Sequence, residues 1–154
     1  MNFPKNKIRF EFKWGALVPL AAFLVITIIR FGLGAGIAAT ALLVACLAAH
    51  EAGHAVTAAA TRTKVSALGF CLKGAYLRRS RAKGAVEILI SLAGPAINLL
   101  LAVLLWSTHG IQAFLAQMNA FLFLINMWPH GGSDGQRILA EIRGMLRVEE
   151  NAAA

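Results

Sequence analysis

Two histidines four residues apart carry the strongest chemical signal in this sequence. They stand in the segment His50-Glu51-Ala52-Gly53-His54. A spacing of four places both imidazoles on one face of an α-helix, where they can reach one metal ion with Glu51 beside them. This is the H-E-x-x-H pattern of zinc hydrolases, in which the glutamate acts as a base and is not a ligand. The small residues between the ligands leave room for a neighbouring helix.

A catalytic zinc site usually has three protein ligands and one open position. The best candidate for the third ligand is Asp134, the only acidic residue between Glu87 and Glu141. It follows Pro129 and two glycines, which allow irregular backbone to fold back toward a polar cavity. Asp134 could instead cap the next helix, and His130 is a rival ligand. A two-histidine site that lacks a carboxylate favours Asp134 as the ligand.

The setting of the motif is apolar. Residues 31–49 contain no charge, and after Glu51 the next charged residue is Arg62. Hydrophobic residues make up 58% of the chain and charged residues only 14%, against about 25% charged residues in soluble domains. The net charge of +8 could suggest nucleic acid, but the basic residues cluster beside the apolar runs. We therefore expect an integral membrane protein in contact with a lipid bilayer and with no nucleic acid.

The elements that position the motif follow from the apolar runs. We predict a single domain, 1–154, with the fold class of an all-α membrane protein, a polytopic bundle of about four transmembrane helices. The predicted spans are 14–30, 33–61, 86–106 and 111–128, and the last two are each near the length of about twenty residues that crosses the hydrocarbon core. Arg30 follows the first span where a signal peptide would have its cleavage site, which favours a retained span.

Two shorter segments complete the predicted fold. β-favouring residues and glycines between 62 and 83 predict a short β-hairpin between the second and third spans, whose edge could bind an extended peptide. Helical spacing over 136–150 predicts an amphipathic C-terminal helix on the membrane surface.

Orientation follows from the basic residues. Fourteen of the fifteen lie before the first span, between the second and third, or after the fourth, and only Arg30 lies on the other side. The positive-inside rule assigns the shared face to the cytoplasm. We therefore expect both termini in the cytoplasm and a metal site that opens toward it, in a bacterial inner or plasma membrane.

Two further segments share a family pattern with the motif. Ser91-Leu92-Ala93-Gly94-Pro95-Ala96-Ile97-Asn98 matches an A-G-P-x-x-N pattern, and Asn126-x-x-Pro129-x-x-x-x-Asp134-Gly135 matches an N-x-x-P…D-G pattern, with Asn119 seven residues upstream. With three motifs in this order, residues 37–140 resemble the site-2 protease family of intramembrane zinc metalloproteases. The resemblance implies an intramembrane endopeptidase that cuts in or near the transmembrane segments of membrane-protein substrates. It implies one Zn2+ per chain, held by His50, His54 and Asp134.

The resemblance also bears on Asn98, which could hydrogen-bond the substrate or simply join two helices. The family favours the first role, so Glu51 and Asn98 are the predicted catalytic residues. Asn119 and Asn126 are expected to be packing groups. The loop before D-G differs from the family's proline-rich stretch, and Gln136 replaces a glycine, which leaves substrate access and loop stiffness open. No PDZ or CBS module is expected, and a non-proteolytic metal carrier or pseudo-protease is the alternative function.

Overall fold

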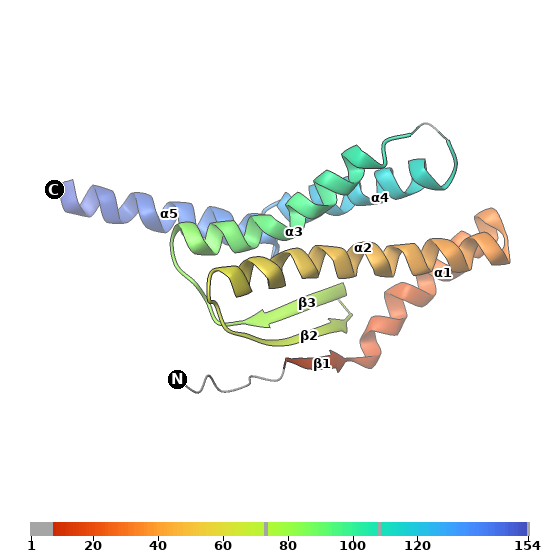
Figure 1. Ribbon diagram of the computed structural model, residues 1–154, viewed down its shortest axis with the longest axis horizontal. Helices are drawn as coiled ribbons and strands as arrows, with labels where there is room; N and C mark the ends of the chain where they lie inside the picture. The colour runs from red at the N-terminus through yellow and green to blue at the C-terminus, as the bar shows by residue number, and fades with distance from the viewer. Residues whose placement is uncertain (1–7, 73, 108, 154) are drawn as a thin grey trace.

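The computed structural model describes residues 8–72, 74–107 and 109–153. Its elements, labelled in Figure 1, are β1 (Arg9–Phe12), a 3-10 turn (Trp14–Ala16), α1 (Leu17–Phe31), α2 (Leu33–Ala60), β2 (Val65–Cys71), β3 (Gly74–Arg79), α3 (Ala85–Leu104), α4 (Gly110–Met127) and α5 (Asp134–Ala153). Four of the helical stretches are long and apolar enough to cross a membrane: Trp14–Phe31, Leu33–Ala60, Ala85–Leu104 and Gly110–Met127. The predicted helical bundle is confirmed, with ends that differ by one or two residues.

Helix α2 is the centre of the molecule. In Figure 1 it lies between the sheet on one side and α3 on the other. Its contact with α3 is close because Gly53 has no side chain. A Cβ at this position would lie 2.8 Å from the Ala93 carbonyl oxygen and 2.9 Å from Ile97. The predicted packing role of Gly53 is confirmed, whereas Ala52 is exposed and faces away from α3, toward the sheet.

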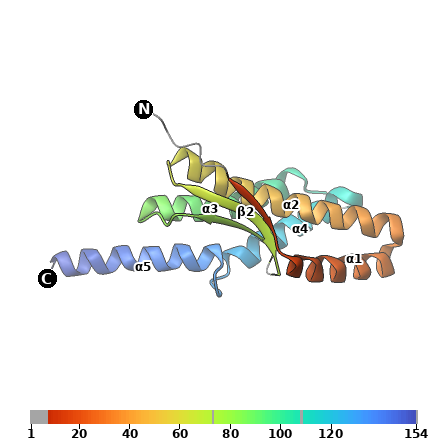
Figure 2. The same cartoon turned by 90° about the horizontal axis from the view of Figure 1, so that it is seen from below.

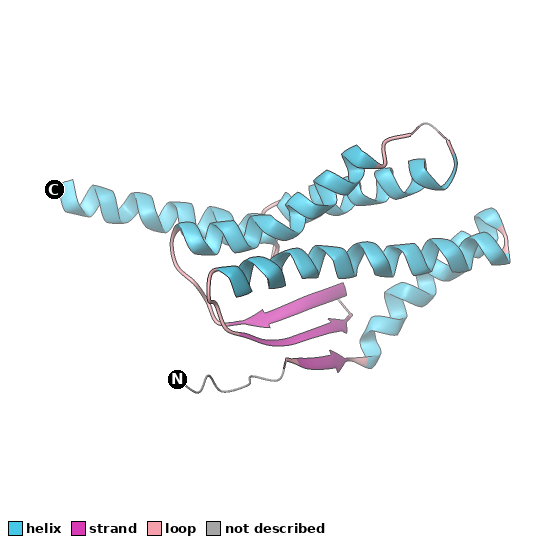
Figure 3. Ribbon diagram, viewed as in Figure 1, coloured by secondary structure: helices cyan, strands magenta, loops and turns pink. Residues whose placement is uncertain are grey.

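The hairpin predicted between the second and third spans is present as β2 and β3, and it belongs to a larger sheet than expected. Strand β1 joins it to give the order β1-β2-β3, with β1 parallel to β2 and β2 antiparallel to β3. Figure 3 shows this small sheet running along one side of α2. The sequence did not predict β1, because four residues are a weak strand signal and its partner lies more than fifty positions further along the chain.

Strand β1 is fixed to both of its neighbours. Gly69 of β2 allows its close approach, since a Cβ there would overlap the Glu11 carbonyl oxygen. The Glu11 side chain reaches across β2 to β3, where Tyr76 Oη donates a hydrogen bond of 2.6 Å and Arg78 Nη1 lies 3.2 Å away. The Tyr76 hydrogen bond lowers the pKa of Glu11 below its ordinary value, which keeps the carboxylate charged.

Helix α5 begins at the site and ends far from it. It contacts α3 near its start, and Figure 2 shows its C-terminal half running out beyond the other elements. The predicted helix is present, and Ile142 and Leu146, which lie four residues apart on one face, are exposed. That the helix lies on a membrane surface stays a prediction. It starts at Asp134, two residues earlier than expected.

Candidate metal centre and adjoining cavities

Two separate helices bring three metal-ligating side chains together. His50 and His54 lie one turn apart on α2, and Asp134 is the first residue of α5. The two Nε2 atoms are 3.1 Å apart, and each lies 3.3 Å from Asp134 Oδ2. All three side chains are buried. Within the described part of the chain, they form the one group of three or more such residues that could hold a metal ion.

The backbone of α3 orients one of the two imidazoles. His54 Nδ1 lies 2.7 Å from the Ile90 carbonyl oxygen, which accepts a hydrogen bond from it. A carbonyl oxygen can only accept, so Nδ1 carries a hydrogen and Nε2 faces Asp134 and His50, an arrangement typical of metal-bound histidines. His50 Nδ1 is buried and has no partner among the described residues.

Gly94 of α3 makes room for both rings. A Cβ at this position would overlap the His54 ring and lie 2.8 Å from His50 Nε2. Any side chain on Gly94 would therefore displace the two imidazoles. The glycine of the A-G-P-x-x-N segment thus has a structural reason that the sequence pattern alone did not supply.

Asp134 faces the histidines because another residue caps its helix. Ser133 Oγ accepts a hydrogen bond from the Gln136 amide at 3.2 Å, and Gln136 Oε1 accepts one from the Gly132 amide at 2.6 Å. Ser133 is therefore the N-cap of α5, and the Gln136 side chain binds the amide one residue before the cap. The alternative that Asp134 is the cap is wrong. Gln136, which departs from the family pattern, ties down the preceding loop.

Burial raises the pKa of Asp134, but the hydrogen bonds to His50 and His54 outweigh burial and lower the pKa to about 2. The carboxylate is therefore ionised and available as a ligand. Two imidazole nitrogens and one carboxylate oxygen form a donor set that suits zinc and that is common in catalytic zinc sites.

Glu51 lies where two hollows meet. The first, here called the polar cavity, has a volume of about 310 Å3 and is lined by Glu51, His54, Arg79, Asn126 and Asp134 among others. The second, here called the apolar cleft, has a volume of about 450 Å3 and lies between α2 and the sheet. Glu51 is half-buried and lines both.

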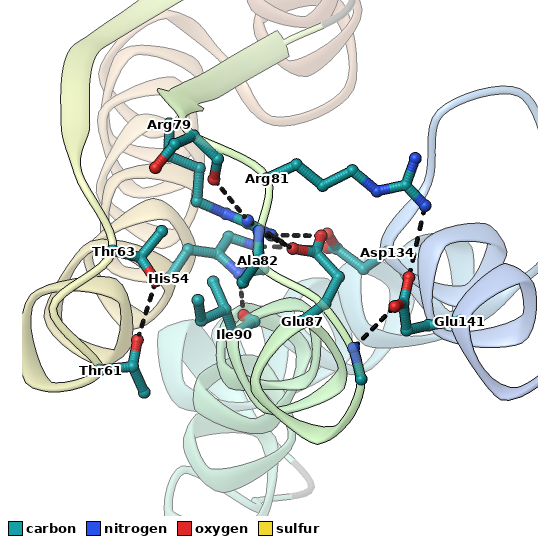
Figure 4. Close-up of polar contacts among 12 residues, drawn as sticks. His54, Thr61, Thr63, Arg79, Arg81, Ala82, Glu87, Ile90, Asp134 and Glu141 are labelled. Atoms are coloured by element: carbon teal, nitrogen blue, oxygen red, sulfur yellow. Dashed lines mark hydrogen bonds and ion pairs between the residues drawn. The ribbon is translucent and has the colours of Figure 1, made fainter. Parts of the chain in front are cut away.

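Arg79, which lines the polar cavity, belongs to a buried ion pair. Arg79 at the end of β3 donates two hydrogen bonds of 2.7 Å to the Glu87 carboxylate in the first turn of α3. Both side chains are 6% exposed. Figure 4 shows the pair beside His54 and Asp134. This pair joins the sheet to the helix that supplies the Ile90 carbonyl.

A second carboxylate holds the same connection from α5. Glu141 accepts a hydrogen bond of 2.7 Å from the Gly84 amide and lies 3.3 Å from Arg81 Nη2. Figure 4 shows both contacts, and they tie α5 to the segment between β3 and α3. Glu141 thus anchors α5 about two helical turns beyond Asp134.

The other predicted residues lie at different distances from the cluster. Asn98 is fully buried in α3, and neither of its amide atoms has a partner in the described structure. Asn119 donates to Cys46 Sγ at 3.2 Å and to the Leu115 carbonyl at 2.9 Å. Asn126 donates to the Leu122 carbonyl at 2.8 Å and lines the polar cavity.

His130, the rival third ligand, is exposed and lies outside the cluster. It lines the polar cavity, and its Nδ1 lies 2.9 Å from the Trp128 carbonyl oxygen. Asp134 therefore remains the predicted third ligand.

Sequence reasoning missed the residues that surround the cluster. The Arg79–Glu87 pair, the Gly94 contact and the aromatic wall of the apolar cleft were not predicted. One signal was present for the pair, since Glu87 is the only charged residue in the third apolar run, and such a residue requires a buried partner.

Together, the fold and the cluster define a polytopic helical membrane protein with a buried His-His-Asp group that could hold a metal. A comparison with solved structures finds a protein of similar fold. The chain is similar to "Site-2 Protease from Methanocaldococcus jannaschii", with a TM-score of 0.72 and 21% sequence identity, over 94% of this chain and 71% of that one. No protein-family model and no curated protein matches the chain. The chain therefore has the site-2 protease fold.

Proposed function

We propose that this chain is an intramembrane zinc metalloendopeptidase whose substrates are membrane proteins. The observation that carries the proposal is the position of Glu51, which lies beside a buried His-His-Asp group and lines two cavities. A site that only stores or carries a metal has no use for a carboxylate base at such a junction. The fold shared with a site-2 protease supports the same conclusion.

His50, His54 and Asp134 would hold one zinc ion, and the structure fits this assignment. The histidine tautomer, the ionised carboxylate and the space left by Gly94 all favour a cation between the three side chains. When bound, zinc acidifies a water molecule and polarises a peptide carbonyl.

Glu51 is the proposed general base. Its carboxylate removes a proton from the attacking water and then passes that proton to the leaving amine. A carboxylate that performs both transfers must reach water on one side and the peptide on the other. The polar cavity supplies the first path, since its lining carries charged and amide groups, and the apolar cleft supplies the second.

The substrate is proposed to be a transmembrane helix, which must unwind locally before its carbonyls can reach the site. Helix-breaking residues in the substrate should therefore accelerate cleavage. The positive-inside rule supports a site that opens to the cytoplasm, in a plasma or inner membrane.

The decisive experiment compares the wild type with Glu51→Gln, purified in detergent with a transmembrane reporter. Loss of a general base lowers a rate by about 10²–10⁴, so cleavage should fall by that factor while zinc content and thermal unfolding stay unchanged. Equal cleavage by the two proteins would refute the assignment of Glu51. A zinc-loaded wild type that cuts no reporter would favour the alternative of a non-proteolytic zinc-binding membrane protein.

A further inference from the structure

The apolar cleft shares Glu51 with the polar cavity, and most of its other lining residues are apolar. Aromatic and aliphatic side chains from the sheet form one wall, and small residues of α2 form the floor. The cleft is lined by Phe10, Glu11, Phe12, Ala48, Glu51, Ala52, Leu68, Gly69, Phe70 and Ala75. Two of these residues carry carboxylates. Glu11 is bound by Tyr76 and Arg78 of the sheet, whereas Glu51 lies on α2.

The floor of the cleft leads to the candidate base. Ala48, Glu51 and Ala52 lie at positions i, i+3 and i+4 of α2 and therefore share one face of the helix. Both alanines are exposed, so the helix presents a shallow surface rather than a filled core. Glu51 also lines the polar cavity. A group bound in the cleft would thus lie directly beside the bond on which Glu51 acts.

The wall opposite α2 is formed in part by strand β1. Phe10 and Phe12 of this strand are 85% and 54% exposed, and such exposed aromatic groups mark a binding surface when they gather at a cleft. The strand is held in place by the close approach at Gly69 and by the Glu11 contacts. The wall is therefore a built part of the fold.

We infer that the apolar cleft is a specificity subsite that binds a bulky apolar side chain, Leu or Phe, next to the scissile bond of a transmembrane substrate. The inference rests on the proposed function and adds a preference for the substrate residue next to the cut. Side chains in an extended peptide point alternately to opposite faces, about 3.3 Å apart along the chain. A peptide whose reacting carbonyl lies at Glu51 therefore places an adjacent side chain over Ala48 and Ala52. The small floor residues leave that space open.

The first test fills the cleft. Ala52→Phe adds a ring to the floor, and it is assayed on reporters that carry Phe, Leu, Val or Ala in turn at each position flanking the cut. A hydrophobic pocket discriminates by about 10–200-fold, so the wild type should cut the Phe or Leu reporter at least tenfold faster than the Ala reporter at one position. In Ala52→Phe this ratio should fall to about one or invert.

The matched control is Ala45→Phe. Ala45 is also an exposed alanine of α2, seven residues earlier, and it lines neither cavity. It should keep the wild-type ratio. A wild type without preference at any flanking position, or an Ala52→Phe ratio equal to that of the wild type, would overturn the subsite.

The second test needs no cleavage. A reporter with a diazirine analogue of leucine beside the cut position is irradiated with Glu51→Gln protein, and the cross-links are mapped by mass spectrometry. Cross-links to the α2 floor or to β2 that disappear in the Glu51→Gln/Ala52→Phe protein support the subsite. Cross-links only elsewhere overturn it. Labelling of the cleft by a diazirine phospholipid that the reporter fails to displace would also overturn the subsite, because the occupant is then lipid. If the wild type cuts no reporter, the proposed function fails; if it cuts every reporter at the same rate, the subsite alone fails.

Discussion

The two hollows that meet at Glu51 differ in how their walls are held together. Three residues that line the polar cavity are held by polar contacts: Arg79 by Glu87, His54 by the Ile90 carbonyl, and Ser133 by Gln136. The apolar cleft is walled by exposed phenylalanines on a four-residue strand. One side is fixed in geometry, whereas the other offers apolar surface to a variable occupant.

Because Glu51 of α2 lines both hollows, this helix contributes both to a rigid polar site and to an apolar binding surface. Proton transfer and metal binding require positions fixed to within fractions of an ångström, which satisfied buried polar contacts provide. Recognition of diverse apolar sequences requires only volume and hydrophobic surface. Changes to polar-side contacts should therefore affect metal binding and stability, whereas changes to the cleft should affect substrate preference.

The largest effect is expected on the polar side, from Arg79→Ala. Removing one partner of a buried ion pair leaves an uncompensated charge and costs about 3–5 kcal/mol, so unfolding in detergent should occur at a much lower temperature or denaturant concentration. The neighbouring Arg78→Ala is the control, because the Arg78 side chain is 57% exposed and its loss should change stability far less. Equal effects of the two substitutions would contradict the distinction between the two walls.

Gly94→Ala should come next, with zinc binding at least about tenfold and up to a hundredfold weaker. The added methyl group overlaps the His54 ring and crowds His50, although no ligand is replaced. Zinc affinity is measured by competition with a chelator. Gly144→Ala in α5 is the control, since its Cβ meets nothing within 4 Å, and it should leave zinc affinity unchanged. Unaltered affinity in Gly94→Ala would show that the rings tolerate the methyl group.

A smaller effect is expected from Ser133→Ala, which removes the cap of α5. Loss of an N-cap costs about 1 kcal/mol, and the loop before Asp134 should exchange its amide hydrogens faster. Ser133→Thr retains a hydroxyl and should restore most of the protection. Hydrogen exchange followed by mass spectrometry measures both. A loop that exchanges at the wild-type rate in Ser133→Ala would show that Gln136 alone holds it.

The smallest effect concerns the apolar side and is pH-dependent. The hydrogen bond from Tyr76 keeps the pKa of Glu11 low and raises the pKa of Tyr76. A carboxylate with a lowered pKa stabilises the folded state above its unfolded pKa, and this contribution disappears as the pH falls through the lowered value. The amides of β1 should therefore lose hydrogen-exchange protection in acid. In Glu11→Gln that acid-dependent step should vanish, and its persistence would assign it to another group.

Much of this architecture follows from patterns that are local in sequence. Apolar runs of span length predicted four helices, and the four-residue spacing of His50 and His54 predicted one shared ligand face, which the structure has. The glycines at 69 and 74 helped to predict the hairpin. In each case, the physical cause acts within a few residues of the chain.

The features that escaped prediction depend on contacts between distant segments. Strand β1 can pair with β2 because Gly69 leaves room for its backbone, and the Tyr76 hydroxyl donates a hydrogen bond to Glu11. The division of roles between Ser133 and Asp134 depends on where α2 places its histidines. The sequence favoured Asp134 as the ligand, but both residues are good caps, and it did not predict that Ser133 would cap α5.

The placement of Asp134 at the very start of α5 has a mechanical consequence. The helix has twenty residues, or about 30 Å at 1.5 Å per residue. Its far end projects beyond the other elements (Figure 2), while its first residue belongs to the His-His-Asp group. Glu141, held by Gly84 and Arg81, divides the rod into a short arm that ends at the ligand and a longer free arm. A sideways force on the free arm would tilt α5 about Glu141 and so move Asp134 at its other end.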